Sequence, residues 1–219
     1  MEVLVIKYLN FVKYIYFLHK IYIYIMEPYN SKFYKDFQSN ESPQAVRLAE
    51  YISRHLLPNK FIDFGCSTGI YLLEIKNKIP QIESIGYEFS KDAIENAVCT
   101  DIIEFNLTNS IDSEKTENTL GLCLEVLEHI DDKDWKPVLE NISKLCDKII
   151  FSAAHTGQND IGHINCRNKI DWIRRFHSLG WVVCLDSTNS LLDYMRSGYH
   201  IGWFTMNAMV LVRAECKTI

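Results

Sequence analysis

The chain has 219 residues, of which 47% are hydrophobic and 23% are charged, and its formal net charge is −5. This length suffices for one domain with a sizeable core, and the composition is ordinary for a globular protein. The mildly acidic charge, without any run of five Lys and Arg residues, gives no global attraction to nucleic acid, so a nucleic-acid partner is disfavoured.

The first 25 residues are almost entirely apolar and aromatic. Lys7, Lys13 and Lys20 interrupt them, so they contain no uncharged span of 18 residues, and no small-residue cleavage site follows. Two interpretations stay open: a membrane-surface segment, since Tyr and Lys suit an interface, or an extension upstream of Met26 as the working start. We favour an extension over residues 1–26 and a single domain over residues 27–219.

Residues 27–40 are polar and aromatic without a clear period, and we expect them to form an arm packed on the domain. A helix is then predicted from Ser42 and Pro43, with the serine as N-cap and the proline in the first turn. Apolar residues recur at helical spacing as far as Leu56.

The stretch from Phe61 to Gly69 organises the rest of the chain. An apolar run containing Asp63 ends in a small-residue turn, and an amphipathic run follows, which predicts strand, turn and helix. Gly65 and Gly69 allow positive φ and a close approach of a ligand to the main chain. Glu88 ends the second predicted strand, where a carboxylate accepts hydrogen bonds from ribose hydroxyls. These residues indicate an adenosine-binding βαβ unit.

Strands and helices alternate along the remaining chain. Further strands are predicted at 82–88, 102–105, 119–124, 148–153, 181–185 and 203–212, and further helices at 90–97, 135–145 and 170–179. The alternation predicts an α/β fold in which helices cover both faces of a mostly parallel sheet. Polar residues that follow the strands should then gather at one edge, where such sheets bind ligands.

Seven cysteines are scattered along the chain without a Cys-x-x-Cys pair. Their odd number and spacing argue against a zinc ribbon or a disulfide framework and favour a reducing compartment, so we expect a cytoplasmic protein.

The residue pattern of the glycine turn distinguishes between two classes of cofactor. The pattern Gly65-x-Ser67-x-Gly69 places Ile70 where a dinucleotide fold has its last glycine. It resembles instead the first motif of class I S-adenosylmethionine-dependent methyltransferases, with Ser67 at their usual middle glycine. The resemblance implies a Rossmann-like, doubly wound sheet of seven strands, mostly parallel, with an antiparallel C-terminal strand. It also suggests that residues 27–40 form a lid over the cofactor, as an alternative to the packed arm.

Three further motifs carry the resemblance, which covers about residues 45–185. Residues 124–130 (LEVLEHI) resemble the LEVxEH motif after the fourth strand of this family, and Asn106-Leu107-Thr108 resembles an Asp-Leu-Thr beside the adenine. Gly157-Gln158 and Gly162-His163-Ile164-Asn165 are similar to a segment of a small-molecule branch found among polysaccharide-modification genes. Ser67 and Asn106 depart from the family pattern, although the Asn106 carbonyl can still accept from an adenine amino group.

The resemblance implies S-adenosylmethionine as cofactor and a set of residues that bind it. They are Asp63, Gly65, Cys66, Ser67, Gly69, Glu88, Phe89, Asn106, Leu107 and Glu125.

The reaction is a direct displacement in which a nucleophile attacks the sulfonium methyl and loses a proton. Histidine suits proton removal, and His129, His155 and His163 follow strands four and five. We assign catalysis to His163 first, then His129, with Glu125 orienting a histidine or accepting from the methionyl ammonium. No metal ligand is assigned in this interpretation.

The predicted function is methylation, on O or N, of a small molecule such as a sugar or glycan precursor. Two alternatives stay open. Glu125, Glu128, His129 and His163 could form a metal site, as in metal-dependent RNA 2′-O-methyltransferases. The second alternative is a non-catalytic protein that only binds the cofactor. It is supported by Ser67 and Asn106, which depart from the family pattern.

Overall fold

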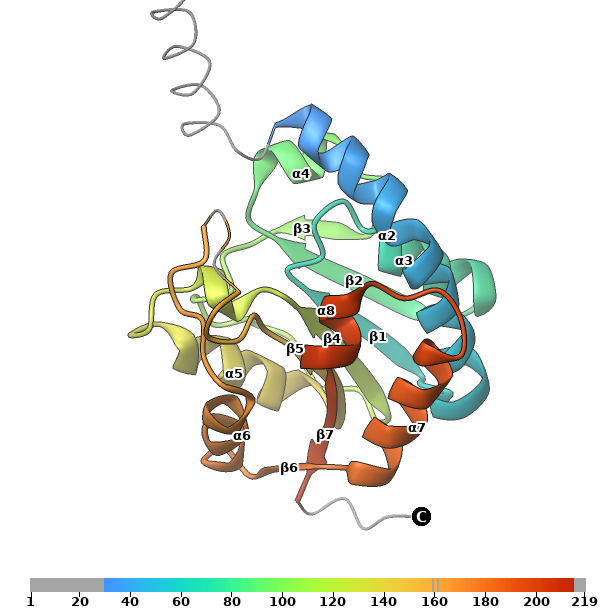
Figure 1. Cartoon of the computed structure of the whole chain (residues 1–219). Coiled ribbons are helices and arrows are strands. Elements are labelled where there is room, and N and C mark those ends of the chain that lie inside the picture. Colours follow the sequence, from blue (N-terminus) through green and yellow to red (C-terminus); the bar gives the residue numbers. More distant parts are fainter. Residues whose placement is uncertain (1–29, 159, 161, 215–219) are drawn as a thin grey trace, which may run out of the picture.

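A computed structural model describes residues 30–158, 160 and 162–214. Its centre is a seven-stranded sheet with the order β3-β2-β1-β4-β5-β7-β6 (Figure 1). The strands are β1 (Lys60–Phe64), β2 (Glu83–Glu88), β3 (Ile102–Glu104), β4 (Thr119–Leu124), β5 (Lys148–Ser152), β6 (Trp181–Val183) and β7 (Met209–Arg213). The first five strands pair in parallel, and β7 runs antiparallel between β5 and β6. This confirms the predicted fold class.

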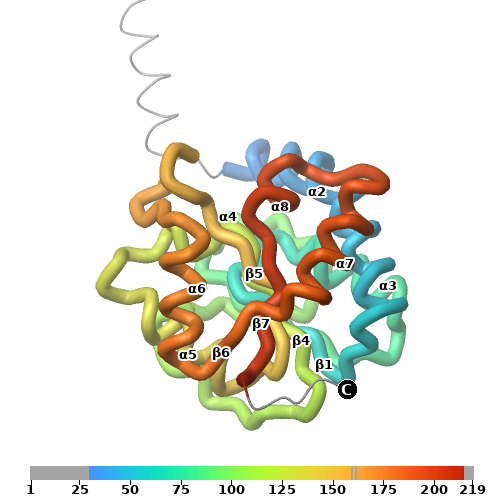
Figure 2. The backbone as a smooth tube through the Cα atoms, turned by 60° about the horizontal axis from the view of Figure 1, so that its bottom comes forward, coloured from blue at the N-terminus to red at the C-terminus, as the bar shows by residue number. Residues whose placement is uncertain are grey.

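Helices cover both faces of the sheet (Figure 2). Each face has its own hydrophobic core. One core joins the sheet to α2 (Ser31–Tyr51), α3 (Ile70–Lys78), α7 (Leu185–Arg196) and α8 (Gly202–Asn207). The other joins it to α5 (Trp135–Leu145) and α6 (Lys169–His177), and a short α4 (Lys91–Glu95) follows β2. The chain reverses direction across the sheet between β1 and β4, so a crevice is expected at their carboxyl ends.

The predicted start of the first helix at Ser42 is wrong, because α2 begins eleven residues earlier, at Ser31. The Asn30 side chain caps it by accepting hydrogen bonds from the amides of Lys32 and Phe33. Pro43 lies inside the helix rather than in its first turn. The proline has no amide to donate within the helix, and the helix is held at this point by tertiary packing, since the nearby Glu41 and Gln44 are buried. Residues 52–56 continue α2 as a π-helical turn.

The C-terminal part of the chain was also predicted incorrectly. A strand at 203–212 is in fact α8 followed by the shorter β7, and no helix was predicted where α7 lies. An apolar run by itself does not distinguish a buried strand from a buried helix, which explains the first error. Among the described residues no helix combines the length and apolar character needed to cross a membrane. The extension predicted over residues 1–26 lies outside the described residues.

Candidate active site

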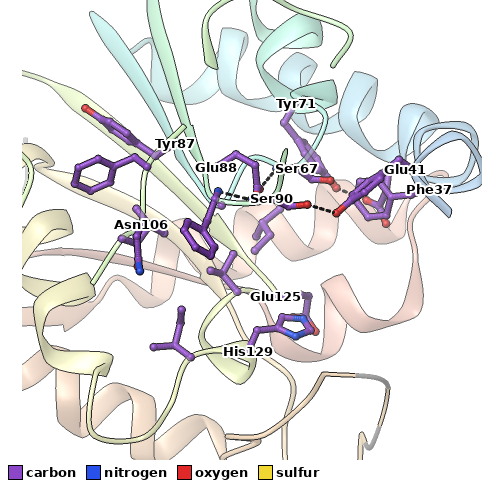
Figure 3. Close-up of a pocket in the computed structure, with 18 of the residues that line it drawn as sticks. Phe37, Glu41, Ser67, Tyr71, Tyr87, Glu88, Ser90, Asn106, Glu125 and His129 are labelled. Atoms are coloured by element: carbon purple, nitrogen blue, oxygen red, sulfur yellow. Dashed lines mark hydrogen bonds between the residues drawn. The ribbon is translucent and has the colours of Figure 1, made fainter. Parts of the chain in front are cut away.

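A cavity of about 480 Å³ opens at the carboxyl ends of β1, β2 and β4 (Figure 3). Its volume lies within the range of small-molecule sites. The sheet and the loops after its strands contribute one wall, and α2 and α8 contribute the other. The lining residues are Phe33, Tyr34, Phe37, Glu41, Gly65, Ser67, Tyr71, Tyr87, Glu88, Phe89, Ser90, Phe105, Asn106, Leu107, Leu124, Glu125, Val126, His129, Ile130 and Trp203.

The glycine turn after β1 forms one edge of the cavity. Gly65 and Gly69 have φ of 77° and 76°, as expected for a turn that needs the left-handed region. A Cβ added at Gly65 would lie 2.5 Å from a methyl group of Val126, so a side chain there would collide with the turn after β4. Ser67 also adopts a positive φ, of 50°, a backbone conformation that is uncommon for a non-glycine residue. The turn therefore keeps glycine-like geometry although its middle residue is a serine.

Glu88 connects this turn to the end of β2. One carboxylate oxygen accepts a hydrogen bond from the Ser67 amide at 2.8 Å. The other oxygen accepts from the amides of Phe89 and Ser90, at 2.8 and 2.7 Å. The oxygen on Ser67 has a second lone pair, so it can also accept from a ligand hydroxyl. The carboxylate is thus fixed in place at the cavity wall.

The structure divides the predicted cofactor-binding residues into two groups. Seven of them line the cavity: Gly65, Ser67, Glu88, Phe89, Asn106, Leu107 and Glu125. Asp63, Cys66 and Gly69 lie behind this wall, outside the lining. Asp63 is only 3% exposed, and burial, with a smaller contribution from the Glu88 charge, raises the pKa of its carboxyl. We infer that these three residues shape the turn from beneath.

Asn106 uses its side chain differently from the expectation. Its carbonyl oxygen accepts from both the amide and the hydroxyl of Thr108, at 3.0 and 2.9 Å, which occupies both lone pairs. The amide nitrogen is therefore the group that Asn106 offers to the cavity. Phe89 also lines the cavity, with 66% of its surface exposed, an unusual value for a large aromatic residue.

Several lining residues were missed by the sequence interpretation. Tyr34 and Phe37 extend from α2 into the cavity, so the described part of the aromatic segment, residues 31–40, is both a packed helix and part of the cavity wall. Glu41 is buried, and its carboxylate accepts hydrogen bonds from the Tyr71 hydroxyl and from the side-chain amide of Gln44. Burial raises the pKa of the Glu41 carboxyl. The excess of aromatic residues in this segment was the available signal, but an incorrect helix start concealed their common face.

The turn after β4 holds a second acidic group. Glu125 has φ of 52°, a left-handed conformation that costs a non-glycine residue free energy and often marks a functional site. Its amide donates to the Ser152 carbonyl at 3.1 Å, and the Asn207 amide lies 3.2 and 3.3 Å from its two carboxylate oxygens. Burial raises the pKa of the Glu125 carboxyl. The carboxylate of Glu125 is therefore aimed and fixed at the cavity wall.

Glu128, His129 and His163 lie next to one another beside Glu125, and we refer to them as the EHH cluster. Each offers one ligand atom, and these atoms lie within 4.8 Å of one another. The rings of His129 and His163 are 4.9 Å apart, centroid to centroid. His129 lines the cavity, whereas His163 lies behind it. The predicted catalytic residues Glu125, His129 and His163 are thus brought together, while His155 hydrogen-bonds the adjacent Thr156 carbonyl and lies outside the cluster.

Solved structures with the same fold are methyltransferases. The O-methyltransferase of a trans-AT polyketide synthase from Brevibacillus brevis, in complex with S-adenosyl-L-homocysteine, has a TM-score of 0.55 at 14% identity and is matched over 87% of this chain and 77% of its own. The sugar N-methyltransferase KedS8 from a Streptoalloteichus species has a TM-score of 0.55 at 12% identity, with 81% and 88% of the two chains covered. The plantazolicin methyltransferase BamL, solved with a triazolic desmethylPZN analogue and S-adenosyl-L-homocysteine, has a TM-score of 0.55 at 16% identity, covering 81% and 86% of the two chains.

A comparison with family models gives one match. Residues 37–182, more than half of the chain, match a model described as a methyltransferase domain. No curated protein matches the chain.

Proposed function

The chain belongs to the methyltransferase-domain family and is an S-adenosylmethionine-dependent enzyme, and from this premise we propose that its acceptor is a small molecule with a hydroxyl or amino group. The observation that carries the proposal is the single cavity wall that runs from the Glu88 carboxylate to Glu125 and His129. One part of the wall suits a nucleoside, and the other presents acidic and imidazole groups to a second ligand. A sugar or glycan precursor is the acceptor class that we favour, because such molecules present hydroxyls.

In this proposal the adenosine lies along β1 and β2. Glu88 accepts from a ribose hydroxyl with the remaining lone pair of the oxygen that also accepts from the Ser67 amide. The exposed ring of Phe89 and the side chain of Leu107 enclose the adenine, which buries apolar surface of Phe89 that is otherwise in water. The methionyl part then extends past Ser67 toward Glu125, so the methyl group faces the region around His129.

The transfer itself requires alignment and the loss of one proton. The acceptor oxygen or nitrogen forms a bond to the methyl carbon while the carbon–sulfur bond breaks, and both electrons of that bond go to sulfur. Holding the reactants collinear supplies much of the rate enhancement. The acceptor proton passes to an imidazole, of His163 in our first assignment and of His129 in the second, while Glu125 orients the histidine; these are the catalytic residues predicted from the sequence.

Isothermal titration calorimetry with S-adenosylhomocysteine and with NAD tests the cofactor assignment. We expect binding of the first and none of the second. A panel of nucleotide sugars, phenols and amines, assayed for release of S-adenosylhomocysteine from S-adenosylmethionine, tests the acceptor class. Tight NAD binding without S-adenosylhomocysteine binding would contradict the assignment.

RNA is the competing acceptor class. The net charge of −5 gives the chain no overall attraction to a polyanion. Methylation of RNA oligonucleotides together with strongly salt-dependent RNA binding, and no turnover on the small-molecule panel, would replace the small-molecule proposal.

A further inference from the structure

We propose that Glu41, on the α2 wall of the cavity, binds a protonated amino group of the acceptor, so that the acceptor is a small amine without phosphate groups, such as an amino sugar. This inference rests on the proposed function and deepens it, because it chooses among the acceptors that offer a hydroxyl or an amino group. The observations behind it are the charges that line the cavity, the burial and hydrogen bonds of Glu41, and the aromatic residues near it.

The charged groups of the cavity wall are unbalanced. Among the described residues that line it, three are glutamates, Glu41, Glu88 and Glu125, and none is a lysine or an arginine. His129 does not balance them, because burial lowers the pKa of its imidazole and the ring is neutral near pH 7. A carboxylate removed from water costs free energy unless a cation or hydrogen bonds compensate it. The compensating cation therefore comes from a ligand, and a ligand that carries phosphate is repelled.

The three glutamates differ in their place in the proposed site. Glu88 accepts three backbone amides beside the ribose, and Glu125 lies where the methionyl part of the cofactor ends. Glu41 lies on the other wall, which α2 and α8 form. Among the described residues that these two helices contribute to the lining, Glu41 is the only charged one. We therefore assign Glu41 to the acceptor rather than to the cofactor.

Neighbouring groups fix the Glu41 carboxylate as a hydrogen-bond acceptor. The Ile201 amide donates to the side-chain oxygen of Gln44 at 2.8 Å, which fixes the orientation of that side-chain amide. The Gln44 nitrogen then donates to the Tyr71 hydroxyl at 2.8 Å and to Oε2 of Glu41 at 3.2 Å. Because the Tyr71 hydroxyl accepts from Gln44, its own proton is directed to the same Oε2 (Figure 3). Oε1 accepts from neither side chain, so it retains the capacity to accept from a ligand.

Burial makes the charge of Glu41 sensitive to a ligand. The residue is only 4% exposed, although it lines the cavity. Burial raises the pKa of its carboxyl, the hydrogen bonds from Tyr71 and Gln44 lower it, and the Glu125 charge raises it further. An ammonium group beside the carboxylate favours the ionised form, because the two charges are opposite. The ion pair would form away from water, where the attraction between charges is stronger than at the surface.

Aromatic residues accompany this carboxylate on the same wall. Phe37 and Tyr34 precede Glu41 by about one and two turns of α2, so the three side chains share one face of the helix. Trp203 of α8 lies close enough to the Glu41 carboxylate to lower its pKa. The faces of aromatic rings attract organic ammonium groups. A carboxylate within an aromatic wall is therefore suited to an alkylammonium ligand.

The bound ammonium group anchors the acceptor and is not itself methylated. A protonated amine has no lone pair, so it cannot attack the sulfonium methyl. The methyl group goes instead to another atom of the same molecule, either a hydroxyl oxygen or a second, unprotonated nitrogen. Since Glu41 and His129 line one cavity, an acceptor anchored at the first can present that atom near the second.

The test uses three probes of one shape that differ in charge: benzylamine, benzyl alcohol and benzoate. Their affinities for the full chain saturated with S-adenosylhomocysteine are measured at neutral pH by ligand-observed NMR. We expect benzylamine to bind about tenfold more tightly than benzyl alcohol, because hydrogen bonds between charged groups are the stronger ones, and benzoate to bind most weakly. Glu41→Gln should abolish the preference for the amine. Asp36→Asn is the matched control, since Asp36 is an exposed carboxylate of the same helix outside the lining.

Three results would overturn the proposal. They are equal affinities of the unchanged chain for benzylamine and benzyl alcohol, an amine preference that survives in Glu41→Gln, and release of S-adenosylhomocysteine from S-adenosylmethionine with a hexose phosphate as acceptor. The first comparison needs no variant, and melting curves show whether Glu41→Gln folds; if it does not, Glu41→Met replaces it.

Calorimetry with S-adenosylhomocysteine keeps the two proposals separate. Its affinity for Glu41→Gln should equal that for the unchanged chain. A tenfold loss in the folded variant would assign Glu41 to the methionyl ammonium and so reject the acceptor assignment. Cofactor binding by the unchanged chain without an amine preference rejects this inference alone, whereas absence of cofactor binding by the unchanged chain rejects the proposed function.

Discussion

At the scale of single residues, the cavity depends on carboxylates whose environments differ. Glu88 accepts three backbone hydrogen bonds, whereas Asp63 is buried with one oxygen that lacks a partner in the described part of the chain. Burial raises the pKa of the Asp63 carboxyl. Substitution of Glu88 should therefore weaken ligand binding, whereas substitution of Asp63 should stabilise the folded chain.

Glu88→Gln should weaken S-adenosylhomocysteine binding by about 1.5–3 kcal/mol, the range for hydrogen bonds to a charged group. The amide replaces one charged acceptor oxygen by a donor, which cannot accept from the backbone amides or from the ribose hydroxyl. Calorimetry measures the effect. Glu83→Gln, at the other end of β2, is the control, and equal affinities for the two variants would contradict the assigned role of Glu88.

Asp63→Asn should raise the free energy of unfolding near neutral pH and reduce its pH dependence. Burial raises the pKa of Asp63 in the folded state, so the native chain holds a proton that the unfolded chain releases. The free energy of unfolding therefore falls as pH rises above about 4, the ordinary value for Asp. Urea unfolding between pH 4 and pH 8 measures this, with Asp112→Asn in an exposed loop as control. An unchanged pH dependence in Asp63→Asn would show that the carboxyl is not the source.

At the scale of elements, α2 forms both a core helix and a wall of the cavity. Its second half packs in the main core through Ala45, Leu48 and Ala49. Its first half is attached through side chains to the two residues that flank α4. The Tyr34 hydroxyl lies 2.9 Å from that of Ser90, and the Gln38 amide donates to the Asn96 carbonyl at 2.6 Å. The two halves should therefore differ in local stability.

Tyr34→Phe should increase amide hydrogen exchange in residues 31–41 and leave residues 44–51 unchanged, because it removes a bond that attaches only the first half of α2. Saturating S-adenosylhomocysteine should slow exchange in the first half of the unchanged chain, since Phe33, Tyr34 and Phe37 line the cavity. Mass spectrometry of peptic fragments reports both effects, and Lys35→Ala on the exposed face is the control. Uniform exchange along α2 in all proteins would reject this division.

The sequence predicted the elements near the glycine turn more accurately than those near the C-terminus. The strand that ends in Asp63 and Phe64 has a turn with two glycines beside it, so its position and its role follow from local chemistry. Residues 185–213 have no comparable signals, and their order as helix, helix and strand depends on which face each packs against. Local pattern is weaker than tertiary context in such a segment.

The residues of the site follow the same division, since those near the glycine turn were easier to predict than those in later loops. Ser67 and Glu88 lie at motif positions, and their contact follows from the strand order. The meeting of Glu128 with His163 belonged to an alternative that the sequence left open, because the two residues follow neighbouring strands. The main-chain bonds from Ile164 and Asn165 that hold the loop there are not revealed by spacing along the sequence.

At the scale of the whole molecule, the described residues form a sheet with both faces covered. We propose that residues 1–26 lie outside this domain, as predicted from the sequence. Deletion of residues 1–25 should then leave cooperative thermal unfolding and S-adenosylhomocysteine binding intact, as measured by calorimetry of both. A truncated chain that loses its unfolding transition would show that the segment belongs to the core.

The position of β7 has a consequence for how the chain is made. This strand inserts between β5 and β6, and β6 pairs with no other strand in the part of the chain that the structure describes. During synthesis, β1 to β5 leave the ribosome while the edge of β5 that will receive residues 209–213 is still open. An open edge of buried apolar residues is a template for wrong pairing with another nascent chain. The chain therefore remains exposed to aggregation until nearly all of its described residues have been synthesised, and a chaperone that covers the β5 edge would protect it over that interval.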